Sequence, residues 1–572
     1  MYNVTCSDNF TVTSTPEING DITTLHIRAA CISEPGKLTV KVRWAIPCAG
    51  IHLLWSPMNF VSKNIPPIWG NLGVVSNAMS SAPVFSCVGY DDTNHLTIAC
   101  SDAKNNVRIC GVIEEDTSLL RFGVTIDVEC SISGYAADVR FDTRSIPFSE
   151  AVEDVVKWWE TFDGYTPAPV PDAAREPLYS AWYSYHQDIV PEKILDECRY
   201  FSRLGCKVII LDDGWHTALE NAVYGSCGDW EVSPEKIPDM KAFVDAVHET
   251  GMKFMLWYSV PFVGELSKAY ELFKDKMLYC AGMGGAWVVD PRYPEVREYL
   301  IDIYRRALLD WGLDGLKLDF IDSFRQSGEV KDGMDYVSVY DAVDRLMKDV
   351  IAALREIKPD VLIEFRQSYM GPLMRTFGNM IRSGDCPRDS LRNRQNVLSL
   401  RMTSGNTAVH SDMTMWHGDE SAEEAAFQLT NVLFSVPQIS VRCRDIPEDH
   451  AEMIKNYLAF WTKYRDVLLD GKMLYKNYVS NYTYVSSLLG NVQVGAVYSG
   501  RIAYLEQQTD EIALVNASGD REILAYADFA GTYRCVVTDC MGRETFAGEI
   551  EFGALARIPM PVNGYAYLTR IS

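Results

Sequence analysis

The sequence predicts an α/β protein built on a (β/α)8 TIM barrel, with a β-sandwich before the barrel and a smaller β-sandwich after it. Two observations favour the barrel: eight short apolar segments occur in the middle of the chain, and most of them alternate with amphipathic helical segments. A third observation predicts the flanks, because short runs rich in Val, Ile and Thr fill both ends of the chain. The 572 residues are enough for several domains with large cores.

The N-terminal β-sandwich is predicted over residues 1–165. Its strand candidates are KLTVKVRWAIP, HLTIAC, LLRFGVTIDVEC and ADVRFDTRSI, which Gly, Asn, Asp and Pro separate. SEAVEDVVKWWETF then has the apolar spacing of a helix. DGYTPAPVPDAAREP follows, and its proline and alanine content is typical of a linker to the barrel.

The barrel is predicted over residues 166–465. Its strand candidates are YSAWYS (179–184), KVIILDDGW (207–215), KFMLWYS (253–259), AWVVD (286–290), GLKLDF (315–320), VLIEFR (361–366), NMIRSG (379–384) and TAVHSD (407–412). One of the helical segments between them, PEVREYLIDIYRRALLDWG, starts with proline and ends with glycine, as helices favour. A doubly wound sheet is the structural rival, but no glycine-rich phosphate loop follows the first strand.

The C-terminal β-sandwich is predicted over residues 466–572, where the chain returns to short strands. The strand candidates are EIALVNAS, TYRCVVTDC, GEIEFGALARIPMP and GYAYLTRI. These short strands suggest a second, small β-sandwich.

Composition limits the kinds of partner. The chain has 47% apolar residues, 23% charged residues and a formal net charge of -24. Such a surface repels phosphate backbones and anionic membranes, so we expect no nucleic-acid partner and no membrane partner. MYNVTCSDNF lacks the basic and apolar regions of a signal peptide, and no long apolar run predicts a membrane span. We expect a small-molecule ligand and leave the oligomeric state open, a homo-oligomer included.

The 15 cysteines are an odd number and are scattered along the chain. Cys535 and Cys540 are close, but no CxxC pair and no Cys/His cluster has zinc spacing. We therefore expect free, mostly buried thiols in a reducing cytoplasm, and no metal site.

Polar residues recur where the predicted barrel strands end, which is where a TIM barrel places its active site. They are Asp212, Asp213 and Trp215 after the second strand, Trp257 on the third, Lys317 and Asp319 on the fifth, Glu364 and Arg366 on the sixth, Arg382 and Asp385 at the seventh, and His410 and Asp412 at the eighth. Carboxylates beside tryptophans and a lysine suit a polyhydroxylated ligand. Two carboxylates that flank an anomeric carbon make a glycosidase.

Each of these residues also has an ordinary structural explanation. A carboxylate at a strand end often caps the next helix or forms an ion pair. Trp257 fits a core position, and His410 fits a hydrogen-bonded structural role. A common site is favoured because it explains the polar groups together, whereas the structural explanations are needed one by one.

Four segments carry a resemblance to a known family. LDDGW, GDWEVSPEKIPDMKAFVDAVHETGMKFMLW, PEVREYL and GLKLDF resemble the bacterial α-galactosidases of glycoside hydrolase family 36, in the retaining clan shared with family 27. AWYSYH resembles the first barrel strand of that family. The resemblance extends from about residue 179 to residue 440 and implies a TIM barrel that cleaves glycosides.

The resemblance implies a role for each matching residue. The family's Lys-x-Asp motif falls on Lys317 and Asp319, so Asp319 would be the nucleophile, and Lys317 would bind sugar hydroxyls and keep Asp319 ionised. The aspartate pair that binds O4 and O6 in the family falls on Asp212 and Asp213. The acid/base motif falls on RSGDCPRD, which makes Asp385 the general acid/base. Asp385 should then be protonated at working pH, which requires a raised pKa.

Five further residues are expected to bind substrate or support the site. Asp389 and Arg392 follow Asp385 in the acid/base segment, and Trp257 and Trp182 lie on matching strands. The loops around them depart from the family pattern. LWYSVPFVG replaces an LWxEPE context, and IEFRQSYMGPLMR has Arg366 where a small residue is common. Arg366 would contact a sugar O2, contact an acidic substituent, or pair with Glu364.

The predicted function is that of a retaining exo-α-galactosidase that releases terminal α-linked galactose from oligosaccharides by double displacement. The alternatives are an α-N-acetylgalactosaminidase, another retaining α-glycosidase or an α-transglycosylase. A barrel that binds sugar without catalysis is the rival from another class. The chemistry requires no metal and no organic cofactor.

Overall fold

The computed structural model describes residues 2–58, 63–70, 73–219 and 223–571, and it confirms the predicted fold class. Eight parallel strands form the central sheet in the order β21-β20-β19-β18-β14-β13-β12-β22. Their bounds are β12 Leu178–Ser180, β13 Val208–Leu211, β14 Lys253–Ser259, β18 Gly315–Asp319, β19 Leu362–Arg366, β20 Met380–Arg382, β21 Ala408–His410 and β22 Gln438–Ile439. Single bridges, from His410 to Val436 and from Thr414 to Ile439, join the two ends of the sheet into a barrel.

One of the eight predicted barrel strands lies outside the barrel, and one strand of the barrel was not predicted. The segment predicted over 286–290 forms β17 (Ala286–Val289), which pairs antiparallel with β15 (Phe262–Gly264) and β16 (Met277–Cys280) outside the barrel. The eighth barrel strand is the two-residue β22, which is too short to give a periodic pattern. Asp319 therefore ends the fourth barrel strand, counted from β12, rather than the fifth.

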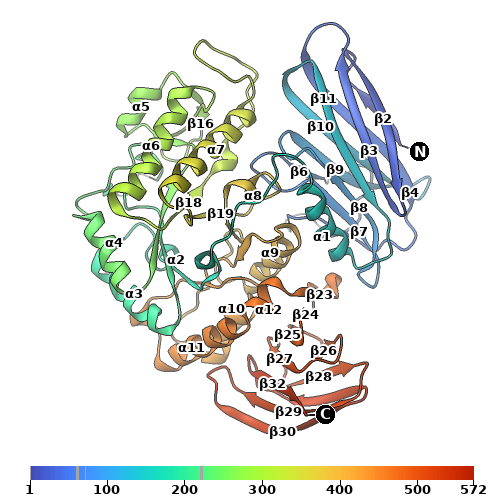
Figure 1. Ribbon diagram of the computed structural model, residues 1–572, viewed down its shortest axis with the longest axis vertical. Coiled ribbons are helices and arrows are strands. Elements are labelled where there is room, and N and C mark those ends of the chain that lie inside the picture. Colours follow the sequence, from blue (N-terminus) through green and yellow to red (C-terminus); the bar gives the residue numbers. More distant parts are fainter. Residues whose placement is uncertain (1, 59–62, 71–72, 220–222, 572) are drawn as a thin grey trace.

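Helices cover the outside of the barrel (Figure 1). They are α2 Trp182–Tyr185, α3 Pro191–Leu204, α4 Met240–Glu249, α5 Lys268–Phe273, α6 Pro294–Trp311, α7 Val339–Ile357, α8 Met374–Phe377, α9 Ser390–Thr403, α10 Ala422–Thr430, α11 Glu448–Lys463 and α12 Arg465–Asp470. α6 has proline at its start and ends at Gly312, whose left-handed φ of 74° a glycine adopts without strain. Residues 182–184, predicted as strand, belong instead to α2.

The segment predicted as a linker is partly packed into the barrel. Its short 3-10 turn, Asp172–Arg175, places Ala174 in a fully buried position against the first residues of several barrel strands, among them Leu178 and Val208. The carbonyl of Ala174 accepts a hydrogen bond of 2.8 Å from His410 Nε2. Residues 172–175 thus fill the amino end of the barrel.

The N-terminal part is a sandwich of two antiparallel sheets that share one apolar core. One sheet contains β1 Asn3–Cys6, β4 Gly36–Pro47, β10 Leu119–Ile132, β9 Asn106–Glu114 and β6 Val74–Ser76. The other contains β2 Phe10–Asn19, β3 Ile22–Cys31, β11 Gly134–Asp142, β8 Asn94–Cys100, β7 Val84–Val88 and β5 Leu53–Trp55. Helix α1 (Phe148–Trp159) follows and packs against this sandwich and α9.

The C-terminal part also consists of two sheets around a core of its own. The larger contains β23 Lys472–Lys476, β24 Tyr484–Leu489, β25 Val492–Val497, β27 Glu511–Asn516, β32 Tyr565–Arg570, β29 Gly531–Thr538 and β30 Glu544–Phe552. The smaller contains β26 Ile502–Leu505, β28 Glu522–Ala527 and β31 Leu555–Pro559.

The three parts are in contact. One apolar cluster includes residues of the N-terminal sandwich, the barrel and the C-terminal sheets, such as Trp55, Trp257 and Val485. Polar contacts add to it: Lys63 of the first part donates a hydrogen bond of 2.7 Å to the carbonyl of Tyr478 in the last. The three parts of the chain therefore pack on one another.

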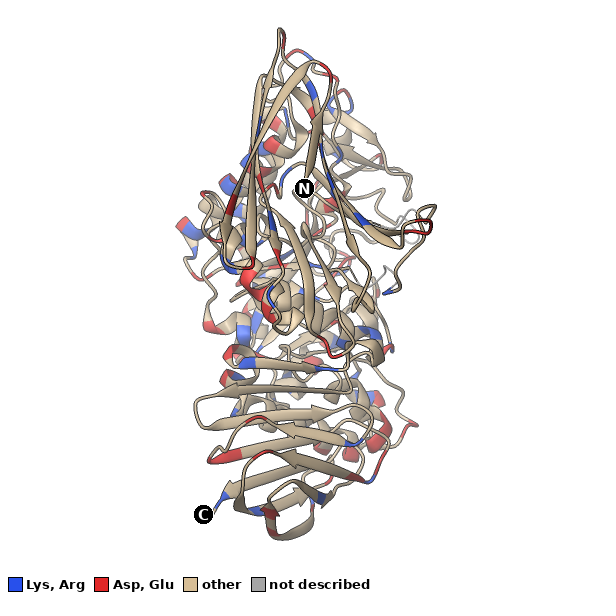
Figure 2. Ribbon diagram, turned by 90° about the vertical axis from the view of Figure 1, so that its right-hand side faces the viewer, with Lys and Arg blue, Asp and Glu red and all other residues tan. Residues whose placement is uncertain are grey.

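Acidic and basic residues are interspersed over the face seen in Figure 2, without a basic stripe. Among the described residues, no helix combines the length and the hydropathy that a membrane crossing needs. In the same part of the chain, no group of three or more His, Cys, Asp or Glu side chains is arranged to hold a metal ion.

Candidate active site

Asp319 lies at the carboxyl end of β18, and its side chain is only 8% exposed. Its Oδ1 accepts three hydrogen bonds: from Arg366 Nε at 2.9 Å, from the Tyr369 hydroxyl at 2.5 Å and from the backbone N–H of Phe320 at 2.8 Å. Its Oδ2 accepts one, from Trp257 Nε1 at 3.0 Å. One carboxylate oxygen is thus anchored firmly, while the other keeps lone-pair capacity for chemistry.

Local backbone geometry helps to hold Asp319. Phe320 has a φ of 59°, in the left-handed region that a bulky residue rarely adopts. This turn directs the N–H of Phe320 toward the carboxylate and toward the Tyr369 hydroxyl, 3.0 Å away. Such a conformation, held by the surrounding contacts, is characteristic of functional sites.

The charge of Asp319 is fixed by its surroundings. Burial favours the neutral acid, but the cations of Arg366 and Lys317 and the hydrogen bonds from Tyr369 and Trp257 outweigh it and hold the pKa of Asp319 well below its usual range. The carboxylate is therefore ionised across the physiological pH range, as a nucleophile must be.

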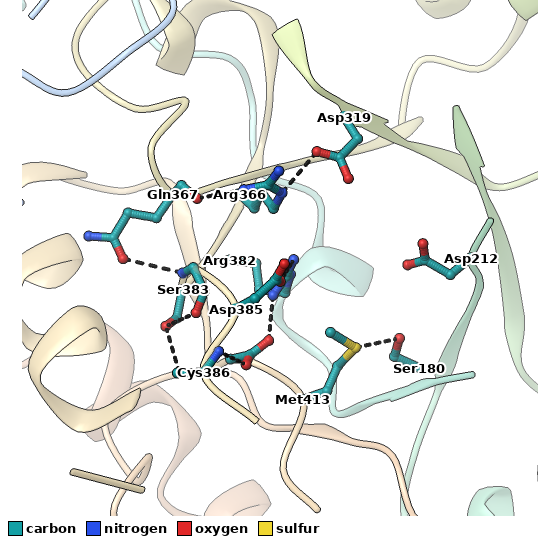
Figure 3. Close-up of polar contacts among 12 residues, drawn as sticks. Ser180, Asp212, Asp319, Arg366, Gln367, Arg382, Ser383, Asp385, Cys386 and Met413 are labelled. Carbon is teal, nitrogen blue, oxygen red and sulfur yellow. Dashed lines mark hydrogen bonds and ion pairs between the residues drawn. The ribbon is translucent and has the colours of Figure 1, made fainter. Parts of the chain in front are cut away.

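Asp212 and Asp213 directly follow β13. Asp212 lies on another side of the site from Arg382 and Asp385 (Figure 3). Asp212 Oδ2 accepts a hydrogen bond of 2.5 Å from Lys317 Nζ, and both side chains of this pair are buried. Asp213 accepts a hydrogen bond of 2.6 Å from Gln187 Nε2. Burial raises the pKa of Asp213 to about 7, and the nearby charge of Asp212 adds to the rise. Asp212 is thus oriented by Lys317, and Asp213 gains or loses a proton near neutrality.

Asp385 follows β20 and is held by Arg382 (Figure 3). Arg382 Nη2 donates to Asp385 Oδ1 at 2.8 Å, and the same guanidinium also binds Asp412. The Asp385 side chain is 50% exposed, whereas that of Arg382 is 1% exposed. Arg366 and Lys317 influence Asp385 as well as Asp319, so the two carboxylates share their cations.

The predicted raised pKa of Asp385 is wrong for this state of the protein. Partial burial works against ionisation, but Arg382, Arg366 and Lys317 lower the pKa of Asp385 below its ordinary value. The structure therefore presents Asp385 as a carboxylate. The opposite applies to Asp412, since its complete burial raises its pKa.

The other predicted site residues occupy different positions. Trp257 is buried beside Asp319, while Trp182 is half-buried in α2, edge-on to His186. Asp389 is exposed and caps α9, accepting a hydrogen bond of 2.9 Å from the backbone N–H of Arg392. Their contacts with substrate stay predictions. The Asp389 contact is the helix cap that was its structural alternative.

Arg366 is paired with Asp319 and not with Glu364. Glu364 is fully buried inside the barrel and accepts a hydrogen bond of 2.6 Å from Gln438 Nε2, which in turn lies 3.3 Å from His410 Nδ1. Burial lowers the pKa of His410 to about 4 and raises that of Glu364 to about 7. This layer supports the site from below and confirms a structural, hydrogen-bonded role for His410.

Two tyrosines of the site were not predicted from the sequence. Tyr369 binds Asp319, and Tyr183 donates a hydrogen bond of 2.9 Å to Asp412 Oδ2. Tyr183 adjoins Trp182 in the segment that resembles the first barrel strand of the family, so the sequence did indicate its neighbourhood. Tyr369 lies in the loop that departs from the family pattern, where position along the chain gave no reason to choose it.

Comparisons with known proteins agree with this architecture. Residues 170–370 match the Melibiase family model. The chain is 28% identical over 160 residues to the α-galactosidase Mel36A of Lactobacillus acidophilus, and 29% identical over 176 residues to an A type blood α-D-galactosamine galactosaminidase of Flavonifractor plautii. These alignments cover 26% and 27% of this chain, and only 20% and 15% of the two relatives.

Solved structures show the same fold at low identity. The α-galactosidase of Lactobacillus brevis superposes with a TM-score of 0.63 at 15% identity, over 100% of this chain and 86% of that one. The family 36 α-galactosidase AgaA of Geobacillus stearothermophilus, in a variant bound to raffinose, gives 0.63 at 15% identity, over 98% and 81%. The chain therefore carries a Melibiase domain in its barrel and is similar to α-galactosidases of glycoside hydrolase family 36, whose fold it shares.

Proposed function

We propose that this protein is a retaining exo-α-galactosidase that releases terminal α-linked galactose from oligosaccharides. The observation that carries the proposal is Asp319, a buried carboxylate kept ionised by Arg366 and Lys317, with a second carboxylate, Asp385, that feels the same two cations. Retaining glycosidases need such a pair, one as nucleophile and one as acid/base. The names of several relatives support galactose as the sugar.

In the first step, Asp319 Oδ2 attacks the anomeric carbon while its Oδ1 stays anchored by the three donors described above. The glycosidic bond breaks, and Asp385 transfers a proton to the departing oxygen. In the second step, ionised Asp385 takes a proton from water, which attacks the anomeric carbon and releases Asp319. Because the resting Asp385 is ionised, it is ready for the second step and must take up a proton for the first.

Asp212 and Asp213 are proposed to bind sugar hydroxyls, with Asp212 on the side of the site away from Arg366 (Figure 3). Asp212 is oriented by Lys317, so its position is fixed before substrate arrives. Such pre-organisation lowers the entropy that binding costs.

Arg366 is proposed to select the group at C2 of the sugar. It is held against Asp319, which attacks C1, and its guanidinium lies 4.7 Å from the ring centre of Tyr369. Within the described part of the chain, Nη2 of Arg366 has no hydrogen-bond partner, so it is available to a sugar hydroxyl. A cationic amine at C2 would be repelled, which favours galactose over galactosamine.

An α-N-acetylgalactosaminidase, another retaining α-glycosidase and an α-transglycosylase remain the alternatives. Hydrolysis of p-nitrophenyl α-galactoside, α-N-acetylgalactosaminide, α-glucoside and α-xyloside discriminates among the sugars. We expect release from the galactoside by the wild type and a strongly reduced release by Asp319→Ala. Release from another glycoside instead would identify a different sugar as the substrate. Release from none of them would contradict the proposal of an exo-glycosidase. Adding raffinose as acceptor, with product analysis, tests transfer against hydrolysis.

We also propose a reducing, cytoplasmic location, which the free state of all 15 cysteines supports. Measuring activity and unfolding temperature with and without a thiol reductant tests this, since an oxidised, disulfide-dependent protein would lose stability on reduction. A homo-oligomeric state is a further proposal, to be tested by light scattering.

A further inference from the structure

A cavity of about 620 Å³ lies where α1, α9 and the turn from α12 to β23 meet (Figure 1). α1 follows the N-terminal sandwich, α9 belongs to the barrel and β23 begins the C-terminal sheets, so all three parts of the chain contribute walls. Gly405 and Asn406 also line the cavity and lead into the amino end of β21, whereas Asp319 lies at the carboxyl end of β18. The cavity is therefore separate from the candidate active site, and its volume is typical of a ligand-binding cavity.

Six charged side chains line this cavity, and four of them have an ion-pair partner. The four pairs, each within 3.0 Å, are Lys157 with Asp154, Glu160 with Arg375, Asp470 with Arg175 and Lys472 with Glu150. The other two, Arg401 on α9 and Glu153 on α1, have no hydrogen bond and no ion pair with any residue that the structure describes. The lining thus presents one unpaired guanidinium and one unpaired carboxylate.

The surroundings disfavour the charge of both unpaired groups. Arg401 and Glu153 are half-buried, and burial raises the pKa of Glu153 to about 7 and lowers the pKa of Arg401. The two side chains influence each other's pKa across the cavity, but their charged atoms are more than 4.0 Å apart. Because a charge removed from water is unfavourable without a partner, each group would be stabilised by a ligand group of opposite charge.

The rest of the lining includes an apolar wall. Val156, Met402, Leu469 and Met473 line the cavity beside the charged side chains. Methionine side chains adapt to irregular shapes, and apolar surface gains free energy when a hydrocarbon group covers it. A cation, an anion and an apolar wall therefore face one space.

We propose that this cavity binds a small apolar zwitterion, an amino acid or short peptide whose carboxylate pairs with Arg401 and whose ammonium pairs with Glu153. A guanidinium binds a carboxylate through two parallel hydrogen bonds, and an ammonium has three donors for the carboxylate oxygens. A ligand with a single charge would leave Arg401 or Glu153 without its partner. The proposal does not depend on the proposed glycosidase activity.

Calorimetric titration with L-leucine and leucyl-leucine tests the ligand class. At pH 7.5 both are mostly zwitterions, and Glu153, with its pKa of about 7, is mostly ionised. N-acetyl-leucine keeps only the carboxylate and leucine amide only the ammonium, so each should bind at least about tenfold more weakly than the better zwitterion. Tighter binding of leucine would identify a free amino acid, and tighter binding of leucyl-leucine a peptide. If neither zwitterion binds to the wild type, or if N-acetyl-leucine binds as tightly as they do, the proposal is wrong.

Two variants test the assigned charges. Arg401→Met should weaken binding of the better zwitterion about 10- to 100-fold, and Glu153→Gln about tenfold. Glu153→Gln preserves the size of the side chain, so it tests the site even if Arg401→Met folds poorly. Arg355→Met is the matched control, because Arg355 of α7 is also half-buried and unpaired among the described residues, and it lies outside the cavity lining. The control should bind as the wild type does, and wild-type affinity in Arg401→Met or in Glu153→Gln would overturn the proposal.

Discussion

Strand β18 carries a buried aspartate at each end, and the two differ in what surrounds them. Asp314, just before the strand, has a side chain that is 6% exposed, and Asp319, at its end, one that is 8% exposed. Asp314 accepts hydrogen bonds from Lys358 at 2.6 Å, His248 at 2.7 Å and Lys253 at 3.3 Å. Asp319 accepts hydrogen bonds of similar length. The pKa is lowered in both aspartates, to about 2 in Asp314.

The comparison teaches that burial and a perturbed pKa do not by themselves mark a catalytic group. Asp314 precedes the amino end of β18, and its partner Lys253 is the first residue of β14, so this contact lies at the end of the barrel opposite Asp319. Asp319 faces a second carboxylate, Asp385, across shared cations, at the end of the barrel where TIM enzymes place their chemistry. Position and convergence separate the proposed nucleophile from the structural aspartate.

The largest expected effect is the loss of activity on replacing Asp319, which tests its contrast with Asp314. Asp319→Ala should lower kcat/KM on p-nitrophenyl α-galactoside by roughly 10³-fold or more, because no covalent intermediate forms. Added azide should restore release by occupying the space of the lost carboxylate and should yield the β-galactosyl azide. Activity above a tenth of wild type without azide would assign the nucleophile to another residue.

Asp385→Ala should show a smaller effect that depends on the leaving group. We expect about 10²- to 10⁴-fold loss on raffinose, whose departing oxygen needs a proton, and a weaker effect on the first step with nitrophenol, which needs none. Because its cationic neighbours lower the pKa of Asp385, wild-type kcat/KM on raffinose should rise as pH falls below neutrality. Equal losses on both substrates would contradict an acid role.

Tyr369→Phe removes one of the hydrogen bonds to Asp319 Oδ1. The expected loss in kcat/KM is about tenfold. The lost bond also raises the pKa of Asp319, so the acid limb of the pH–kcat/KM profile should move to higher pH. Tyr258→Phe is the matched control, since the buried Tyr258 hydroxyl has no hydrogen-bond partner among the described residues and its removal should leave activity intact.

Asp314→Asn should change stability and leave kcat within about twofold, which is the reverse of the Asp319 result. The expected cost is about 2 kcal/mol in the free energy of unfolding. Because the folded pKa of about 2 lies below the unfolded value near 4, the contribution is complete above about pH 4 and disappears as the pH falls toward 2. Urea unfolding at pH 7 and at pH 3 measures this, with the exposed Asp310→Asn as control. A large loss of kcat would break the comparison.

The barrel was predictable because its longer strands and helices leave periodic apolar patterns. β14 and β18 were found close to their true bounds, and α6 was found with both of its ends. β17 was predicted to be a barrel strand because an apolar strand followed by a helix has the same sequence pattern whether the strand pairs parallel or antiparallel. β22 has two residues, and nothing so short produces a period.

By itself, the sequence determined which residues could form the site: the Lys317 and Asp319 pair at a strand end, Asp212 and Asp213 after another, and Asp385. Parallel strands in a barrel bring these ends together, so alternation was enough to assemble them. Only the tertiary structure decided which oxygen of Asp319 is held and which is free. The donors from Arg366 and Tyr369 lie 47 and 50 residues further along the chain.

The tertiary structure also decided the charge of Asp385. Its pKa depends on the distances to Arg382, Arg366 and Lys317, and those distances are set by how three strands are packed. Residue type and spacing fix which groups can ionise, because they are covalent properties of the chain. Electrostatic interaction and desolvation vary with separation and burial, and these exist only once the barrel has closed.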